Sequence, residues 1–258
     1  MRARSALFTL FGDVVRPHGG EAWLSTLTAY MDALGFTAEA TRTALHRMSA
    51  EGWVEPRRAG RFAAYRLTAR GEARLEEAAE RIYRLRAADW DKHWRLLVHR
   101  GALPAAVVRE LGWVGFGRLT PDVWVSPHPH DAHLDELLAA AGLLEAVHRF
   151  TSAAGGDADR IVAEAWDLSR LRAGHEEFLR QWARAKPPRD PRRAFAQRVR
   201  LVHHWRGFLF SDPGLPDALL PDDWRGEQAT AVFQQRHAEL RERSEPWAIA
   251  RREGGPGR

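Results

Sequence analysis

The first 51 residues contain three short helical patterns in succession, and each is followed by a break. Apolar side chains recur at helical spacing in the first two patterns, and Gly35 stands where a helix commonly ends in a left-handed residue. Thr37 is a suitable N-cap for the third. Helices are therefore predicted at Ala3–Val15, Trp23–Leu34 and about 37–51. Two helices joined by so short a turn form a helix-turn-helix.

Two strand patterns follow the third helix, at Trp53–Glu55 and Phe62–Leu67. The connector between them is polar and contains glycine, which is typical of a hairpin loop. It also carries three arginines, Arg57, Arg58 and Arg61. A charged helix is predicted from Thr68 to about Asp89, as a linker between domains or part of a dimer interface.

The third helix has two different faces. Ala44, Leu45 and Met48 point one way and are predicted to pack on the first two helices. The opposite face offers cationic and hydroxyl donors from Arg42, Thr43, His46 and Arg47. The major groove of DNA admits one helix, and its base edges favour arginine on guanine.

The arginines of the hairpin are predicted to contact phosphates or the minor groove, where they position the protein. The plain alternative is a solvated amphipathic helix beside an arginine-rich loop. The stretch from Glu39 to Arg70 holds seven arginines and three glutamates. Its basic character and its position after a helix-turn-helix favour DNA binding over the alternative.

Charge and composition restrict the remaining possibilities. Residues 1–86 and 186–258 each carry a net charge of +4, and residues 87–185 carry −3, so only the two ends are expected to face a polyanion. The absence of cysteine excludes disulfides, thiolate catalysis and cysteine-ligated metals. No apolar run is long enough to cross a bilayer and no signal peptide is evident, so a cytoplasmic protein is expected.

The middle of the chain alternates strand and helix patterns in the order strand, helix, strand, strand, helix, strand. The six elements are predicted at Trp94–His99, Pro104–Leu111, Val114–Leu119, Val123–Ser126, Ala132–Ala141 and Leu144–Phe150. This is the order of a ferredoxin-like fold. The stretch Ala153–Asp157 is expected to be flexible.

The last third is predicted to be helical, at Asp167–Ala185, Ala194–Phe210 and Gly226–Arg243. The expected fold class is α+β in three parts. These are a winged helix-turn-helix DNA-binding domain with a linker helix (1–88), a ferredoxin-like, Cas2-like middle domain (93–165) and a helical C-terminal domain with a disordered tail (166–258).

Several motifs resemble the PaaX-type transcriptional repressors, regulators of phenylacetic acid catabolism, and they occur in the family's order over nearly the whole chain. They are SALFTLFGDVV, ATRTALHRMSAEGWV, YRLTARG, GFGRLTPDVWVSP, AWDL and HHWRGFLFSDPGLPDALLPDDWRG. The resemblance implies a homodimeric repressor that binds double-stranded operator DNA. No cofactor is predicted. It also implies that an aromatic acyl-CoA such as phenylacetyl-CoA releases the operator.

Two further groups of residues are weaker candidates for sites. His203, His204, Trp205 and Arg206 combine cations with a flat ring, which suits an acyl-CoA, although a capped, buried helix is the commoner reason for such a run. His128, His130 and His133 have a spacing that could ligate a metal, but prolines interrupt the stretch.

No residues form a recognisable catalytic centre, so the protein is predicted not to be an enzyme. The middle domain resembles the Cas2 nucleases, but its first strand ends in Val98-His99-Arg100-Gly101 without the metal-binding aspartate. The alternatives kept open are a regulator of another aromatic or acyl-CoA pathway, a nucleic-acid-processing enzyme and a protein–protein adaptor.

Overall fold

The protein is described here by a computed structural model, which covers residues 1–83, 89–129 and 131–253. The chain forms two compact units that are not continuous in sequence. The first consists of Met1–Arg84, Phe178–Arg206 and Gln228–Arg258, and the second of Leu85–Glu177 and Gly207–Glu227. The three predicted domains follow the order of the chain, whereas the contacts group the N-terminal region with two later segments.

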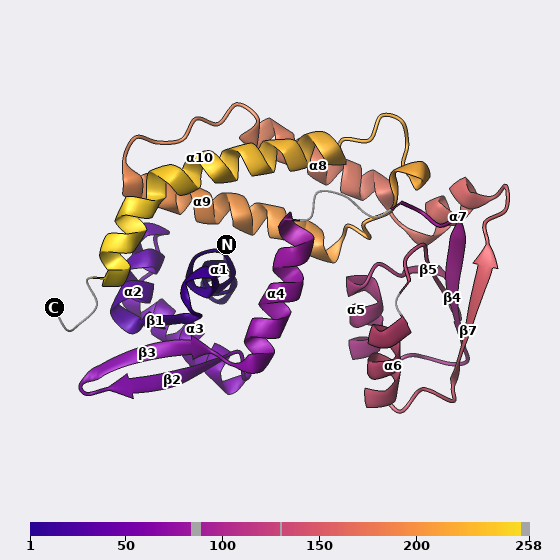
Figure 1. The fold of residues 1–258 in the computed structure, drawn as a ribbon, viewed down its shortest axis with the longest axis horizontal. Coiled ribbons are helices and arrows are strands. Elements are labelled where there is room, and N and C mark those ends of the chain that lie inside the picture. Colours follow the sequence, from indigo (N-terminus) through magenta and orange to yellow (C-terminus); the bar gives the residue numbers. More distant parts are fainter. Residues whose placement is uncertain (84–88, 130, 254–258) are drawn as a thin grey trace. The chain divides into compact units, whose positions relative to one another are not determined.

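The first unit begins with the three predicted helices (Figure 1). Their apolar faces form one core. They are α1 (Ala3–Leu10), α2 (Leu24–Ala33) and α3 (Ala38–Ala50). A π-helical segment, η1 (Phe11–Val15), and a 3₁₀ turn, η2 (Arg16–His18), extend α1. Leu7, Leu27 and Leu45 are fully buried, so each helix contributes to the same core as its apolar spacing predicted.

A three-stranded antiparallel sheet follows, in the order β1-β3-β2. Its strands are β1 (Glu21–Trp23), β2 (Val54–Ala59) and β3 (Phe62–Leu67). The hairpin β2–β3 is the wing of a winged helix-turn-helix, and it projects beyond the helices in Figure 1. The predicted loop at Pro56–Arg61 was wrong, because β2 continues to Ala59 and only Gly60 and Arg61 turn. Pro56 is tolerated there since β2 is an edge strand.

The end of the wing is tied back to the helices by Thr68 and Gly71. The Thr68 hydroxyl donates to the Gly52 carbonyl at 2.7 Å and accepts from the Gly71 amide at 3.1 Å. A Cβ on Gly71 would lie 2.3 Å from the Trp53 carbonyl oxygen, so this position requires glycine. Thr68 thus starts α4 (Ala69–Tyr83) and fixes the wing relative to α3.

Two C-terminal helices complete the first unit: α9 (Pro191–Trp205) and α10 (Gly226–Glu253). Phe195 and Val199 of α9 and Ala248 of α10 are buried in the same core as α1, α2 and α3. The core of the winged helix is therefore extended by two helices that lie more than 100 residues later in the chain.

Helix α10 is longer than predicted. It continues through Pro246 to Glu253, whereas the sequence pattern indicated an end near Arg243. A proline removes one helical hydrogen bond, but tertiary contacts hold the last turns on α2. The Tyr30 hydroxyl donates to the Ala248 carbonyl at 2.8 Å, and the Thr26 hydroxyl donates to the Arg251 carbonyl at 3.0 Å.

The second unit contains a four-stranded antiparallel sheet in the order β5-β6-β4-β7. With its helices, the order is β4 (His93–His99), α5 (Ala105–Trp113), β5 (Gly117–Thr120), β6 (Val123–Ser126), α6 (Asp131–Ala140) and β7 (Val147–Ala153). This topology confirms the predicted ferredoxin-like fold. The last strand lies about three residues later than predicted and includes Ala153, which pairs with His93.

The two faces of this sheet have different coverings. Leu111 of α5 and Leu138 of α6 pack against Leu97 and Trp124 on one face. On the other, Val162 of the unpredicted helix α7 (Ala158–Ala165) packs with Trp94 and Val125, together with the turn η4 (Asp217–Leu219). Residues of α8 (Leu168–Trp182) belong to both units, and a 3₁₀ turn, η3 (Arg206–Phe210), follows α9. None of the described helices is both long and apolar enough to span a membrane.

Candidate nucleic-acid interface

Helix α3 presents the predicted polar face to solvent. Arg42, Thr43, His46 and Arg47 are all exposed. On the opposite side, Leu45 and Met48 are fully buried. A single helix that is anchored by one face and offers guanidinium, imidazole and hydroxyl groups on the other has the geometry required for insertion into a major groove.

The turn before α3 holds this helix in a fixed direction. Gly35 has φ +91°, which a side chain would make strained, and it ends α2 in the left-handed conformation. Thr37 then caps α3, because its side-chain oxygen accepts a hydrogen bond from the Ala40 amide at 3.1 Å. The fully buried Thr41 donates to the Thr37 carbonyl at 2.9 Å. Both ends of the turn are thus fixed by local chemistry that the sequence indicated.

The wing arginines are exposed but do not form one cluster. Arg57 and Arg58 are neighbours in β2, so their side chains point to opposite faces of the hairpin. The Arg57 guanidinium lies 3.4 Å from the Glu21 carboxylate of β1. The central carbon of the Arg61 guanidinium lies 5.0 Å from the centroid of the Phe62 ring. These contacts are exposed and weak, so the three guanidinium groups are available to DNA phosphates.

A group of charged residues that are buried or partly buried lies on the side of the unit that packs on α9 and α10. We call it the polar seam, and it consists of Asp13, Arg198, His237 and Glu245. The Asp13 carboxylate accepts hydrogen bonds from Arg198 Nε and His237 Nε2, both at 2.8 Å. Arg198 also donates to the Asp13 carbonyl at 3.0 Å and lies 3.4 Å from Glu245.

The electrostatics of the polar seam favour the ionised carboxylate. Burial alone would raise the pKa of Asp13, but Arg198 and His237 together lower it well below its ordinary value. The Asp13 side chain is 2% exposed and that of Arg198 4%. This group was not predicted from the sequence. Its signal was a lone aspartate in the otherwise apolar stretch SALFTLFGDVV.

His203 and Arg206, two of the candidate effector-binding residues, contact α1. The Thr9 hydroxyl lies 3.2 Å from His203 Nδ1, and Arg206 donates to the Ser5 carbonyl and the Thr9 hydroxyl, both at 3.0 Å. Burial, followed by the charge of Arg206, lowers the pKa of His203 to about 4. His203 is therefore neutral at pH 7.

The other two candidates face the interior of the first unit. Trp182 donates through its indole nitrogen to His204 Nδ1 at 3.0 Å. The Trp205 ring stacks on Phe233 with a centroid distance of 4.8 Å. The four residues are therefore adjacent in sequence but contact different parts of the unit, and each has a packing role. Their role in effector binding stays a prediction.

The candidate metal residues fall mostly beyond what the structure describes. His130 and the side chain of His133 lie outside the described residues. His128 follows β6, and its backbone amide donates a hydrogen bond to the Ser126 hydroxyl at 3.1 Å. Strand β4 ends at His99, which is buried, and Arg100 and Gly101 follow. The described end of this strand therefore carries no carboxylate for a nuclease metal.

Comparison with known proteins agrees with this architecture. Three family models match in succession: "PaaX-like protein" at residues 2–71, "PaaX protein central Cas2-like domain" at 87–162 and "PaaX-like protein C-terminal domain" at 166–250. The solved structure of the uncharacterized protein Rv0674 from Mycobacterium tuberculosis is 27% identical. It matches with a TM-score of 0.63 and covers 95% of this chain and 98% of its own.

A curated relative carries a functional name. The transcriptional repressor PaaX of Escherichia coli (strain K12) is 34% identical over 240 residues, which are 87% of this chain and 76% of the relative. This match confirms the prediction that the protein is a regulator and not an enzyme. With the family models, it shows that the chain belongs to the PaaX family of transcriptional repressors.

Proposed function

We propose that the protein is a homodimeric repressor that binds a pseudo-palindromic operator and leaves it when an aromatic acyl-CoA such as phenylacetyl-CoA binds. The observation that carries the DNA part is the exposed polar face of α3, with Arg42, Thr43, His46 and Arg47 on a helix whose other face is buried. In this proposal α3 enters the major groove and contacts bases, and the wing arginines contact phosphates.

The homodimer and the effector rest on the family resemblance. Two-fold symmetry in the protein requires two half-sites in the operator, about one helical turn apart or a multiple of it. Coupling between the sites is reciprocal: if the thioester weakens operator binding tenfold, the operator must weaken thioester binding by the same factor. A free acid lacks the phosphates of CoA and is expected to bind less tightly than its thioester.

Operator binding is tested on DNA fragments from the promoter next to the gene of this protein. We expect fluorescence anisotropy to show binding that survives excess non-specific DNA, and footprinting to show two protected half-sites. Addition of phenylacetyl-CoA should release the fragment, while phenylacetate and unmodified CoA should do so less effectively. Binding equal to that of shuffled DNA would refute the repressor, and a thioester without effect would refute only the proposed effector.

A further inference from the structure

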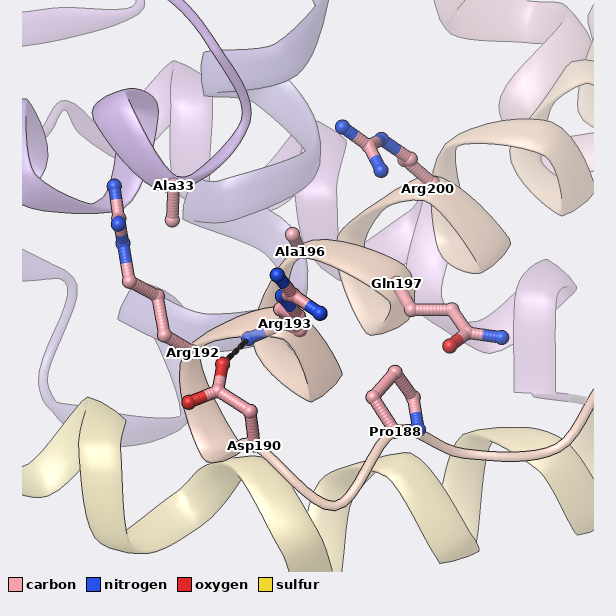
Figure 2. Close-up of a pocket in the computed structure, with 8 residues that line it drawn as sticks. All are labelled: Ala33, Pro188, Asp190, Arg192, Arg193, Ala196, Gln197 and Arg200. Carbon is pink, nitrogen blue, oxygen red and sulfur yellow. Dashed lines mark hydrogen bonds between the residues drawn. The ribbon is translucent and has the colours of Figure 1, made fainter.

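A cavity of about 740 Å³ lies within the first unit, between the end of α2 and the first turns of α9 (Figure 2). Its volume falls in the range of small-molecule sites, roughly 300–1000 Å³. Arg192, Arg193 and Arg200 of α9 line it, together with Gln197. We call it the arginine pocket. No residue of the predicted effector group contributes to its lining.

The pocket has an excess of positive charge. The lining contains three guanidinium groups and one carboxylate, that of Asp190. This carboxylate already caps α9, because it accepts a hydrogen bond from the Arg193 amide at 2.7 Å. Arg192 pairs with Asp32 of α2 at 2.6 Å. The guanidinium groups of Arg193 and Arg200 form no hydrogen bond or ion pair with any residue in the described part of the chain. These cations are therefore available to an anion from solution.

The arrangement differs from an ordinary solvated helix face. Arg193, Gln197 and Arg200 follow the spacing i, i+4, i+7 and so share one side of α9. That side lines the open cavity, and the positive end of the α9 dipole lies at the same place. Small apolar residues, Ala33, Pro188 and Ala196, complete the wall. The chemistry suits a ligand with several phosphates and a flat or apolar part.

We propose that the arginine pocket binds the phosphate-bearing end of a small organic polyphosphate, the phosphorylated adenosine of an acyl-CoA. The ligand's identity rests on the proposed function, but the pocket and its charge do not. A DNA backbone would present phosphates on a convex surface, which contacts protruding groups more readily than a recess. The concave shape therefore favours a small ligand over DNA.

The position of the pocket offers a route to the DNA-binding helix. Ala33 is the last residue of α2, and the short turn capped by Thr37 leads directly into α3. A phosphate that attracts Arg192 competes with Asp32 for the same guanidinium group. Occupation of the pocket would then loosen the link between α9 and the end of α2, next to the turn that orients α3.

Direct binding measurements on the full chain test the inference. Calorimetry with adenosine 3′,5′-bisphosphate and with phenylacetyl-CoA should show binding to the natural protein. The double variant Arg193→Gln/Arg200→Gln should bind both about tenfold or more weakly, because two charge-assisted contacts are lost. The matched control Arg241→Gln/Arg243→Gln removes the same charge from exposed positions of α10 that do not line the pocket, and it should bind as the natural protein does.

Gln197 supplies a second test at one position. It is partly exposed and lies on the helix between the two arginines. Gln197→Glu adds a negative charge and should weaken binding of the bisphosphate, whereas Gln197→Lys should strengthen it. A change of opposite sign in two variants of the same residue cannot come from a general loss of folding.

The outcomes separate this inference from the proposed function. If phenylacetyl-CoA releases DNA from the natural protein and from the arginine double variant equally, the proposed function stands and the pocket inference is wrong. If the bisphosphate binds in a manner that requires Arg193 and Arg200 but no thioester acts on DNA, the pocket stands and the effector fails. Loss of DNA affinity in the double variant with unchanged bisphosphate binding would make the pocket a DNA contact and overturn the inference.

Discussion

The exposed face of α3 and the polar seam both contain arginine and histidine, yet these side chains differ in their exposure and in their hydrogen-bond partners. Arg42, His46 and Arg47 are exposed and lie on a helix whose first turn is capped by Thr37. Arg198 is 4% exposed and bonded to Asp13 and Glu245. Residue type alone therefore does not separate a binding group from a structural one. The difference is whether the chain itself supplies the partner.

The largest expected effect comes from the polar seam. Asp13→Ala should lower the free energy of unfolding by about 3–5 kcal/mol, because it leaves the buried charge of Arg198 without its carboxylate. Urea denaturation measures the change. Asp32→Ala is the matched control, since Asp32 also pairs with an arginine of α9 but is exposed. It should cost only ~0.2–1 kcal/mol. Equal losses in the two variants would contradict the distinction between buried and exposed pairs.

The exposed face of α3 should behave in the opposite way. Arg42→Ala or Arg47→Ala should weaken operator binding by ~1–3 kcal/mol if the side chain contacts a base, with no change in melting temperature. Anisotropy with operator and shuffled DNA measures specific affinity. The control Arg243→Ala removes an exposed arginine from α10 and should leave the affinity unchanged. Unaltered affinity and footprint in both α3 variants would mean that another surface contacts the bases.

The wing should contribute affinity without specificity. Replacement of Arg57, Arg58 and Arg61 by alanine should weaken binding to all sequences alike and reduce the slope of log K against log salt, because fewer counterions are released. Glu21→Gln is the matched variant of opposite sign. It removes the carboxylate that lies 3.4 Å from Arg57 and should leave binding unchanged or slightly tighter. A triple variant with altered base preference and an unaltered slope would show that the wing contributes to specificity.

The contact between α9 and α1 should make the stability of the protein depend on pH. Burial lowers the pKa of His203 to about 4 in the folded protein, whereas its ordinary value is about 6.5. As the pH falls below about 6.5, His203 is therefore protonated in the unfolded chain before it is protonated in the folded one, and unfolding is favoured. The natural protein should therefore lose more stability than His203→Gln between pH 6.5 and 4. Urea denaturation of both proteins at pH 7 and pH 4.5 measures the difference. A stability difference that does not vary with pH would mean that His203 is not held neutral.

The exposed face of α3 and the side of the unit that packs on α9 also differ in how far they could be predicted from the sequence. The division of α3 into Leu45 and Met48 on one side and Arg42 and Arg47 on the other follows from helical spacing, and the structure has the same division. The arginine pocket and the polar seam had no comparable signal. In the polar seam α9 contacts Asp13, and in the arginine pocket it lies beside Ala33. No local sequence pattern specifies contacts between segments so far apart in the chain.

The sequence alone determined the elements whose signals are local. Helix periodicity, the cap at Thr37 and the left-handed Gly35 defined the helix-turn-helix, and the strand–helix order defined the ferredoxin-like sheet. Tertiary structure decided what depends on partners distant in the chain. Strand pairing extended β2 to Ala59, contacts with Tyr30 carried α10 through Pro246, and Arg198 met Asp13 across 185 residues. Periodicity and caps act within a few residues, whereas burial and charge pairing depend on which segments the folded chain brings together.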